Sequence, residues 1–148
     1  TGGFNFKVSY KNWDLGSNFR FSLGNYVYNG YEQSKANTSE LYNSKGYYEN
    51  ATKDITTLGW TSYNYPLTDY FVQNASFLKC DNITLGYNFN NVLKMGKYHG
   101  ISGRIYASCS NVFTITKYKG IDPEVNSGKD DSMYPRCRTF LLGLNLNF

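Results

Sequence analysis

The sequence lacks any long apolar run. Its mean hydropathy is −0.53, and no stretch approaches the roughly 18 consecutive apolar residues that a membrane-spanning helix needs. A helical membrane span is therefore excluded. A transmembrane β-barrel is not excluded, because residues that face lipid alternate along each strand with residues that face water, so the average hydropathy of a barrel stays low.

Cysteine and histidine are also scarce. The three cysteines, Cys80, Cys109 and Cys137, are odd in number and widely spaced, without a C-x-x-C pair. Zinc and redox motifs are therefore absent, and we expect small side chains on strands rather than a disulfide framework. The single histidine, His99, falls in an expected turn, which argues against a Ser-His-Asp arrangement. The sequence predicts no enzyme and no cofactor.

No strong charge of one sign is present. The net charge is +4, from 15 basic and 11 acidic residues, and the basic residues are scattered, so we expect no binding of nucleic acid. Asp122, Glu124, Asp130 and Asp131 form an acidic group that lacks the regular ligand spacing of a calcium loop. We therefore predict a structured turn with solvated carboxylates there, and no metal site.

The chain contains only three prolines and is 18% aromatic, with fifteen Tyr and ten Phe, a composition typical of β-rich proteins. It opens T-G-G-F without an initiator Met, a basic segment or an apolar segment, so no export signal is visible. We expect that the protein was processed or that its start lies upstream.

Alternating apolar residues are the main positive feature. The final residues place one apolar side chain at every second position, which puts all of them on one face of a strand: Phe140, Leu142, Leu144, Leu146 and Phe148. The other face carries mostly Thr, Gly and Asn, with Leu141 as an exception. A stripe of this kind that ends on an aromatic residue is typical of a strand that faces lipid.

Five strands are expected from this pattern, with a tight turn at 14–17 between the first two. Their ranges are 3–14, 17–29, 75–89, 101–116 and 137–148. We predict that their apolar residues face outward and their neighbours face a polar interior: Phe4, Phe6, Phe19, Phe21, Ile83, Leu85, Phe140, Leu142, Leu144 and Leu146. The connections alternate between short and long, as in outer-membrane barrels, where long loops are extracellular. The sequence thus predicts extracellular loops at 30–70 and 117–136 and a periplasmic C-terminus.

Two other architectures fit part of the pattern. A secreted β-sandwich that binds carbohydrate is also aromatic-rich and alternating, although it does not need its long loops on one side. A passive porin-like channel shares the same strand pattern. Five strands are too few to close a barrel, because known barrels begin at about eight, so a barrel interpretation makes this chain part of something larger.

Aromatic side chains in the first long loop are candidates for contact with a ligand or a partner. Their rings offer both an apolar face and a polar edge. The residues selected are Trp60, Tyr63, Tyr65 and Tyr70. Because a long loop also needs a small core of its own, we expect loop packing or contact with a partner protein in preference to direct contact with the ligand.

Three segments occur in an order that carries a family resemblance. They are F-L-K-C-D-N-I-T-L-G-Y-N-F, R-I-Y-A-S-C-S-N-V-F-T-I-T-K-Y-K-G-I-D-P-E-V-N and Y-P-R-C-R-T-F-L-L-G-L-N-L-N-F. With the upstream W-D-L and S-L-G-N-Y-V-Y-N-G, they resemble the C-terminal end of SusC-like TonB-dependent outer-membrane transporters of Bacteroidetes. The cysteines depart from the family, which more often has other small or apolar residues there.

This resemblance implies a plugged barrel of about 22 strands, of which this chain forms the last five. It implies uptake of a large nutrient, an oligosaccharide or a peptide, with energy delivered through TonB by segments upstream of this chain. A SusD-like surface lipoprotein is the implied partner. The resemblance also implies that the stripe ending at Phe148 is read as an assembly signal in the outer membrane.

Overall fold

The computed structural model describes residues 1–36, 53, 68–90, 100–125, 127–131 and 134–147. The chain divides into two compact units. The first comprises residues 1–22, 77–115 and 136–148, and the second comprises residues 23–76 and 116–135. Among the residues described, no helix combines the length and the apolar character needed to cross a membrane.

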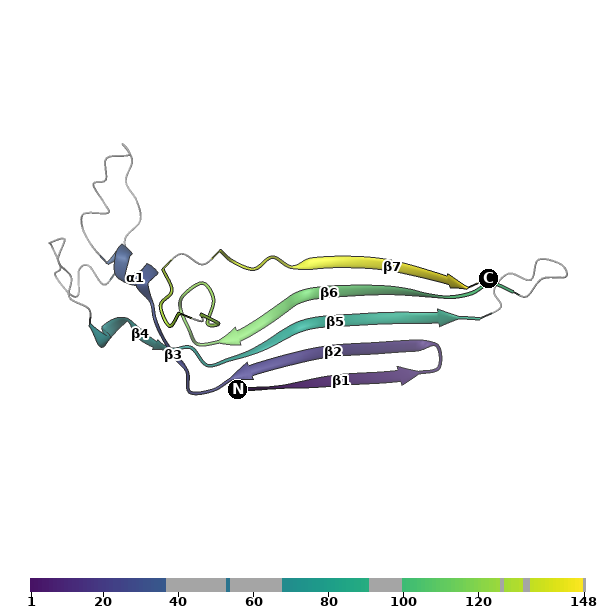
Figure 1. Ribbon diagram of the computed structural model, residues 1–148, viewed down its shortest axis with the longest axis horizontal. Coiled ribbons are helices and arrows are strands. Elements are labelled where there is room, and N and C mark those ends of the chain that lie inside the picture. The colour runs from purple at the N-terminus through teal and green to yellow at the C-terminus, as the bar shows by residue number, and fades with distance from the viewer. Residues whose placement is uncertain (37–52, 54–67, 91–99, 126, 132–133, 148) are drawn as a thin grey trace, which may run out of the picture. The chain divides into compact units, whose positions relative to one another are not determined.

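The first unit is a five-stranded sheet with the order β1-β2-β5-β6-β7 (Figure 1). The strands are β1 (Gly2–Tyr10), β2 (Trp13–Ser22), β5 (Phe77–Phe89), β6 (Ser102–Thr116) and β7 (Thr139–Asn147). Strand β2 pairs antiparallel with β1 and with β5, and β6 pairs antiparallel with β7. The predicted all-β, antiparallel fold class is confirmed, and the described strands form an open sheet with β1 and β7 at its edges.

The two faces of this sheet differ in chemistry. Cross-strand partners lie on the same face, and the register pairs Phe4 with Phe19, Leu15 with Leu85, and Ile105 with Leu144. We call this side the apolar face. The opposite side, the polar face, pairs Asn5 with Asn18 and Arg104 with Asn145.

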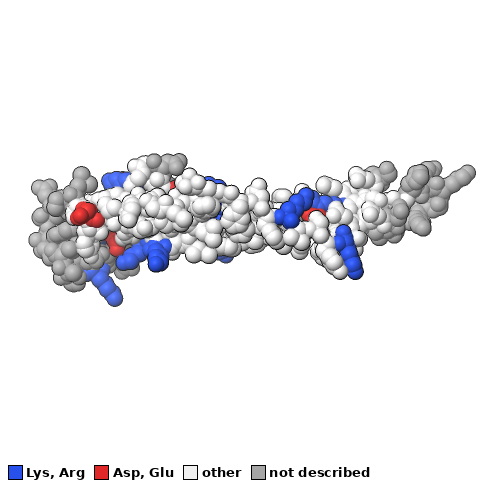
Figure 2. Space-filling view, turned by 90° about the horizontal axis from the view of Figure 1, so that it is seen from below, with Lys and Arg blue, Asp and Glu red and all other residues white. Residues whose placement is uncertain are grey.

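The apolar face is exposed rather than packed into a closed core. Phe140 is 77% exposed and Leu142 is 79% exposed, and all nine residues of β1 are exposed. Along the side of the molecule seen in Figure 2, Lys and Arg lie in separate groups, with surface between them that is neither acidic nor basic. A soluble sandwich would cover its apolar face with a second sheet, and none of the described residues does so for Phe140 and Leu142.

The first hairpin turns earlier than the sequence predicted. Tyr10 pairs with Trp13, so the connection is the two residues Lys11 and Asn12, and the predicted turn at 14–17 is wrong. Lys11 has a φ of 52°, a left-handed conformation that two-residue hairpin turns require. Asp14 lies inside β2 instead, where its carboxylate has a partner on the polar face.

The predicted strand 17–29 is interrupted. Strand β2 ends at Ser22, and Gly24 follows with a φ of 75°, a backbone conformation that favours glycine. Tyr26–Tyr28 then forms a separate strand, β3, which pairs antiparallel with β4 (Val72–Asn74). Phe19, Phe21 and Leu23 alternate with polar residues, but Asn25 breaks this pattern immediately before β3, although the predicted strand extends through that position.

Strand β5 contains a bulge that is absent from the strand predicted at 75–89. Asn18 pairs with Asn82 and Phe19 pairs with Cys80, so Asp81 is an additional residue in β5. An extra residue shifts the two-residue alternation by one position. Leu78 and Cys80 therefore lie on the same face as Ile83 and Leu85, although the first two have even residue numbers and the last two have odd ones.

The second unit is built around β3 and β4, with helix α1 (Gly30–Lys35) and the 3₁₀ helix η2 (Asp69–Phe71). Asn29 caps α1, since its side chain accepts a hydrogen bond from the Glu32 amide at 2.9 Å. Its core contains Val27, Ala75 and Tyr118, with Val125 packed against them. The long loop predicted at 30–70 thus contains helical turns at both ends, and the loop at 117–136 contributes Tyr118 to a core.

Candidate functional site

The polar face of the sheet carries a bridge between two strands that are not neighbours. Arg104 on β6 donates hydrogen bonds to both carboxylate oxygens of Asp14 on β2, with a distance of 3.2 Å from Nε to Oδ1. Asn88 on β5 donates to the same Oδ1 at 3.1 Å. Because β5 lies between β2 and β6, this bridge joins three strands across the polar face.

Gly86 provides the space that this bridge needs. A Cβ atom added at Gly86 would lie 2.6 Å from the Arg104 guanidinium and 2.6 Å from the Asp14 carboxylate. Distances this short are not tolerated between atoms that are not bonded, so a larger residue at Gly86 would displace the bridge. Glycine is therefore needed at position 86 because the side chains of Asp14 and Arg104 meet directly above it.

The Asp14 and Arg104 pair is expected to contribute modestly to stability. The side chains are 17% and 36% exposed, and ion pairs that remain open to solvent typically contribute about 0.2–1 kcal/mol. We expect a double-mutant cycle of Asp14→Ala and Arg104→Ala to give a favourable coupling energy of about 0.2–1 kcal/mol for unfolding in detergent micelles. A coupling energy near zero would mean that the bridge contributes no net stability.

Two further polar clusters extend along the same face. Arg20 on β2 forms an ion pair with Asp81, the additional residue of the β5 bulge, and one of its hydrogen bonds measures 2.8 Å. Asn82 donates to the Ser108 hydroxyl at 2.9 Å, and Thr84 lies 2.9 Å from the same hydroxyl. The polar face is thus connected by hydrogen bonds from β2 across β5 to β6, as a wall that faces water or another polar surface requires.

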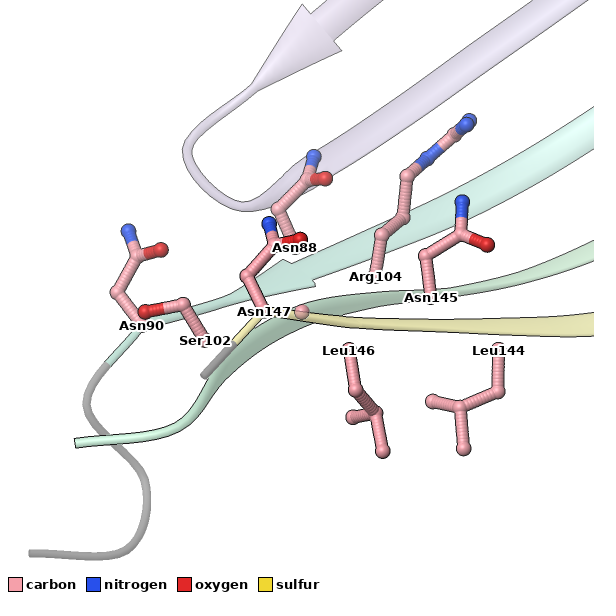
Figure 3. A pocket seen from close by; sticks show the side chains of 9 residues that line it. Asn88, Asn90, Ser102, Arg104, Leu144, Asn145, Leu146 and Asn147 are labelled. Atoms are coloured by element: carbon pink, nitrogen blue, oxygen red, sulfur yellow. The ribbon is translucent and has the colours of Figure 1, made fainter.

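A hollow rich in amide groups lies at the end of the polar face near the close of β7. Its volume is about 610 Å³. Figure 3 shows Asn88, Arg104, Asn145 and Asn147 extending to one side of the strands, while Leu144 and Leu146 extend to the other. Amide side chains both donate and accept hydrogen bonds, so this hollow suits polar groups of either kind.

Carboxylates in the second unit are held by protein groups. Asp130 is fully buried, and its Oδ2 accepts hydrogen bonds from the Tyr118 hydroxyl at 3.0 Å and from the Ile121 amide at 3.2 Å. Burial and the neighbouring Asp130 carboxylate raise the pKa of the Tyr118 hydroxyl well above its ordinary value. The hydroxyl therefore remains a hydrogen-bond donor throughout the physiological pH range.

The other acidic residues of this segment also have partners. Asp122 accepts from the Glu124 amide at 3.0 Å, and Asp131 pairs with Lys129 at 2.9 Å. Within the described ranges, no three His, Cys, Asp or Glu side chains are arranged to hold a metal ion. Asp130 differs from the solvated carboxylates that the sequence predicted, because it is buried in the core of the second unit.

The aromatic residues selected from the sequence are only partly described. Tyr70 is 48% exposed, and its ring packs edge-on against Phe71 with the ring centroids 5.2 Å apart. Trp60, Tyr63 and Tyr65 lie outside the described residues. Contact of these four residues with a ligand or a partner therefore stays a prediction.

The structure describes four of the five alternating apolar residues at the end of the sequence. Phe140, Leu142, Leu144 and Leu146 share the apolar face of β7 and are exposed, whereas Phe148 lies outside the described residues. The sequence did not indicate that Asp14, Gly86 and Arg104 form a group. The only signal in the sequence was one charged residue, Asp14 or Arg104, at a polar position of each of two strands. Nothing in the sequence indicated that these strands, β2 and β6, are the two neighbours of β5.

The sequence is similar to TonB-dependent receptors, although it matches no family model. The TonB-dependent receptor SusC of Bacteroides thetaiotaomicron is 49% identical over 148 residues, which are 99% of this chain and 15% of the relative. The TonB-dependent receptor P3 of Formosa agariphila is 30% identical over 165 residues, covering 100% of this chain and 16% of the relative.

Solved structures agree with the sequence relatives. The RagAB peptide importer in its closed-closed state matches 99% of this chain and 17% of its own chain, with a TM-score of 0.76 and 26% identity. The open-open state gives a TM-score of 0.74. The chain spans about 15% of the length of its SusC relative. Since sequence identity and fold agree over nearly all of its residues, this chain belongs to the SusC-like TonB-dependent receptors.

Proposed function

We propose that this chain forms part of the barrel wall of a transporter that takes up a large nutrient across the bacterial outer membrane, with energy delivered through TonB. The observation that carries this proposal is the 49% identity to SusC over 99% of the chain. The sheet supports it, because one face is apolar and exposed while the other carries hydrogen-bonded polar groups. A barrel wall needs that combination between lipid and a polar interior.

The proposed orientation places the C-terminus on the periplasmic side. The β1–β2 connection has only two residues. In sequence, the two segments of the second unit, residues 23–76 and 116–135, are much longer, and they come between β2 and β5 and between β6 and β7. Outer-membrane barrels have short periplasmic turns and longer extracellular loops. Both long segments are therefore proposed to be extracellular.

Protease accessibility tests this orientation. We expect protease added to intact cells to cut in 30–70 or 117–136 if it cuts this part of the protein at all, because the extracellular loops are the segments exposed to it. Peptide mapping of the released fragments locates the cuts. Cleavage at the Lys11–Asn12 turn from outside intact cells would reverse the orientation, and permeabilised cells serve as the control in which that turn becomes accessible.

A SusD-like surface lipoprotein is the proposed partner, as the family resemblance implies. The second unit supports this by presenting several exposed aromatic rings, which are favoured in protein interfaces: Tyr26, Tyr31, Tyr70 and Tyr134. Trp60, Tyr63 and Tyr65 are proposed to act with them in contact with the lipoprotein or the ligand. The upstream plug and TonB-contacting segments complete the transporter.

Two substrate classes are proposed, in order. An oligosaccharide comes first, because SusC is the more similar relative at 49% identity and the resemblance to its family implies mostly glycan uptake. A peptide comes second, because the structurally similar RagAB is a peptide importer and shares 26% identity. Stacking of exposed tyrosines suits sugar faces, since an aromatic ring supplies apolar area and a polar edge.

Uptake by cells distinguishes these proposals. A strain that lacks the full-length gene is compared with a strain in which the gene is restored, using labelled oligosaccharides and labelled peptides and an energy uncoupler as a control. We expect restored, energy-dependent uptake of one class. Uptake that survives the uncoupler would indicate a passive porin-like channel instead, and recovery of the protein in the aqueous fraction would favour a secreted carbohydrate-binding sandwich.

A further inference from the structure

The apolar face contains a groove that is distinct from the amide-rich hollow on the polar face. It has a volume of about 330 Å³ and is lined by side chains of β2, β5, β6 and β7, among them Trp13, Leu85, Tyr87, Ile105, Ala107 and Leu142. Pockets that hold small molecules commonly measure about 300–1,000 Å³. Ala107 is the smallest of these lining residues, and its cross-strand partner is the much larger Leu142. The groove is therefore a depression in a surface of larger apolar side chains.

Aromatic rings form one end of the groove. Trp13 and Tyr87 are cross-strand partners, with ring centroids 4.8 Å apart and planes inclined by 57°. Tyr10 is paired with Trp13 on the other side. Trp and Tyr are enriched where the hydrocarbon of a membrane meets its headgroups, because each ring has an apolar body and a polar tip. This end of the groove is thus suited to the level of the lipid headgroups.

A positive charge lies beside this aromatic end. Lys11 occupies the β1–β2 turn, and its Nζ lies 5.4 Å from the centroid of the Tyr10 ring. A lysine over an aromatic face is held by a cation–π interaction. The ammonium therefore lies beside Tyr10, whose cross-strand partner Trp13 lines the groove. From there it complements an anionic group at the headgroup level.

We propose that this groove binds a phospholipid, with an acyl chain along Leu85, Ala107 and Leu142 and the phosphate near Lys11. The inference rests on the proposed location in the outer membrane and adds a specific lipid site to it. Apolar lining and a cation at one end match the two parts of an anionic phospholipid. Lipid held in this groove exchanges more slowly than lipid on the rest of the apolar face.

Ala107→Leu tests the acyl-chain part of the proposal by filling the groove. The full-length transporter is reconstituted in nanodiscs of phosphatidylethanolamine and phosphatidylglycerol in equal amounts, and native mass spectrometry counts the phospholipids that remain bound after transfer to detergent. We expect Ala107→Leu to retain at least threefold less phospholipid than the wild type. Cys109→Leu is the matched control, because it adds a large apolar side chain to the same face of β6 outside the groove.

Lys11→Glu tests the headgroup part. It should reduce retained phosphatidylglycerol relative to phosphatidylethanolamine by at least threefold. Lys11 is exposed at a turn, so this variant leaves the groove intact. Equal retention by Ala107→Leu, Cys109→Leu and wild type overturns the proposal. If Ala107→Leu does not assemble, unchanged selectivity in Lys11→Glu overturns it. Recovery of the wild type in the outer-membrane fraction tests the proposed location separately.

Discussion

Leu144→Arg is expected to destabilise the assembled protein by about 2–4 kcal/mol if Leu144 lies near the bilayer midplane, because that is the cost of an arginine on the lipid face at that depth. Leu144 lies on the apolar face of β7 opposite Ile105, and both side chains are exposed. A guanidinium at this position would have to leave water for hydrocarbon. The outer-membrane yield and the fraction of protein with heat-modifiable mobility measure the loss.

Leu141→Arg is the matched control for this experiment. It makes the same substitution of the same residue type in the same strand, but Leu141 lies on the polar face opposite Ser108. We expect its effect to be within about 0.5 kcal/mol, as for most exposed positions away from special contacts. Equal losses for the two variants would contradict the assignment of the apolar face to lipid.

Asp130→Ala is expected to loosen the second unit by about 1.5–3 kcal/mol, the range for hydrogen bonds to a charged group. The substitution removes the acceptor of the Tyr118 hydroxyl and of the Ile121 amide, and both groups would be left without this partner next to a core. Hydrogen exchange of the amides between 118 and 131 in the full-length protein measures the change.

Asp131→Ala provides the comparison for Asp130→Ala. Its carboxylate is about half exposed and pairs with Lys129 at the surface, where an ion pair contributes little because solvent screens it. We expect exchange in this variant to match the wild type. If Asp130→Ala also exchanged at the wild-type rate, the buried hydrogen bonds of Asp130 would have no part in ordering this segment.

The apolar alternation was the part of the fold that the sequence predicted best. A period of two has one physical cause, the opposite directions of successive side chains in a strand. The pattern therefore predicts one shared face for Phe140, Leu142 and Leu144 without any information on neighbouring strands. The family resemblance depended on long motifs in order, and the comparison with SusC confirms it.

Turns and interruptions were predicted less well because they depend on contacts between distant residues. Asp14 and Gly16 are typical turn residues, yet both lie in β2, where Asp14 accepts hydrogen bonds from Arg104. The bulge at Asp81 is visible in the sequence as a shift in the alternation. In β5, the residues of the apolar face have even numbers up to Cys80 and odd numbers from Ile83 onward. The structure shows that Asp81 is the additional residue and that its carboxylate pairs with Arg20.

The bridge over Gly86 has a consequence for the evolution of this family. Asp14, Gly86 and Arg104 depend on one another. The ion pair can cross β5 only because Gly86 has no side chain, and the ion pair fills the space above Gly86. A larger residue at Gly86 alone produces a clash, and loss of Arg104 alone leaves the Asp14 carboxylate with the neutral amide of Asn88 in place of its charged partner. In related sequences these three positions should therefore covary, and a receptor with a larger residue at the position of Gly86 should have lost the acid and the arginine together.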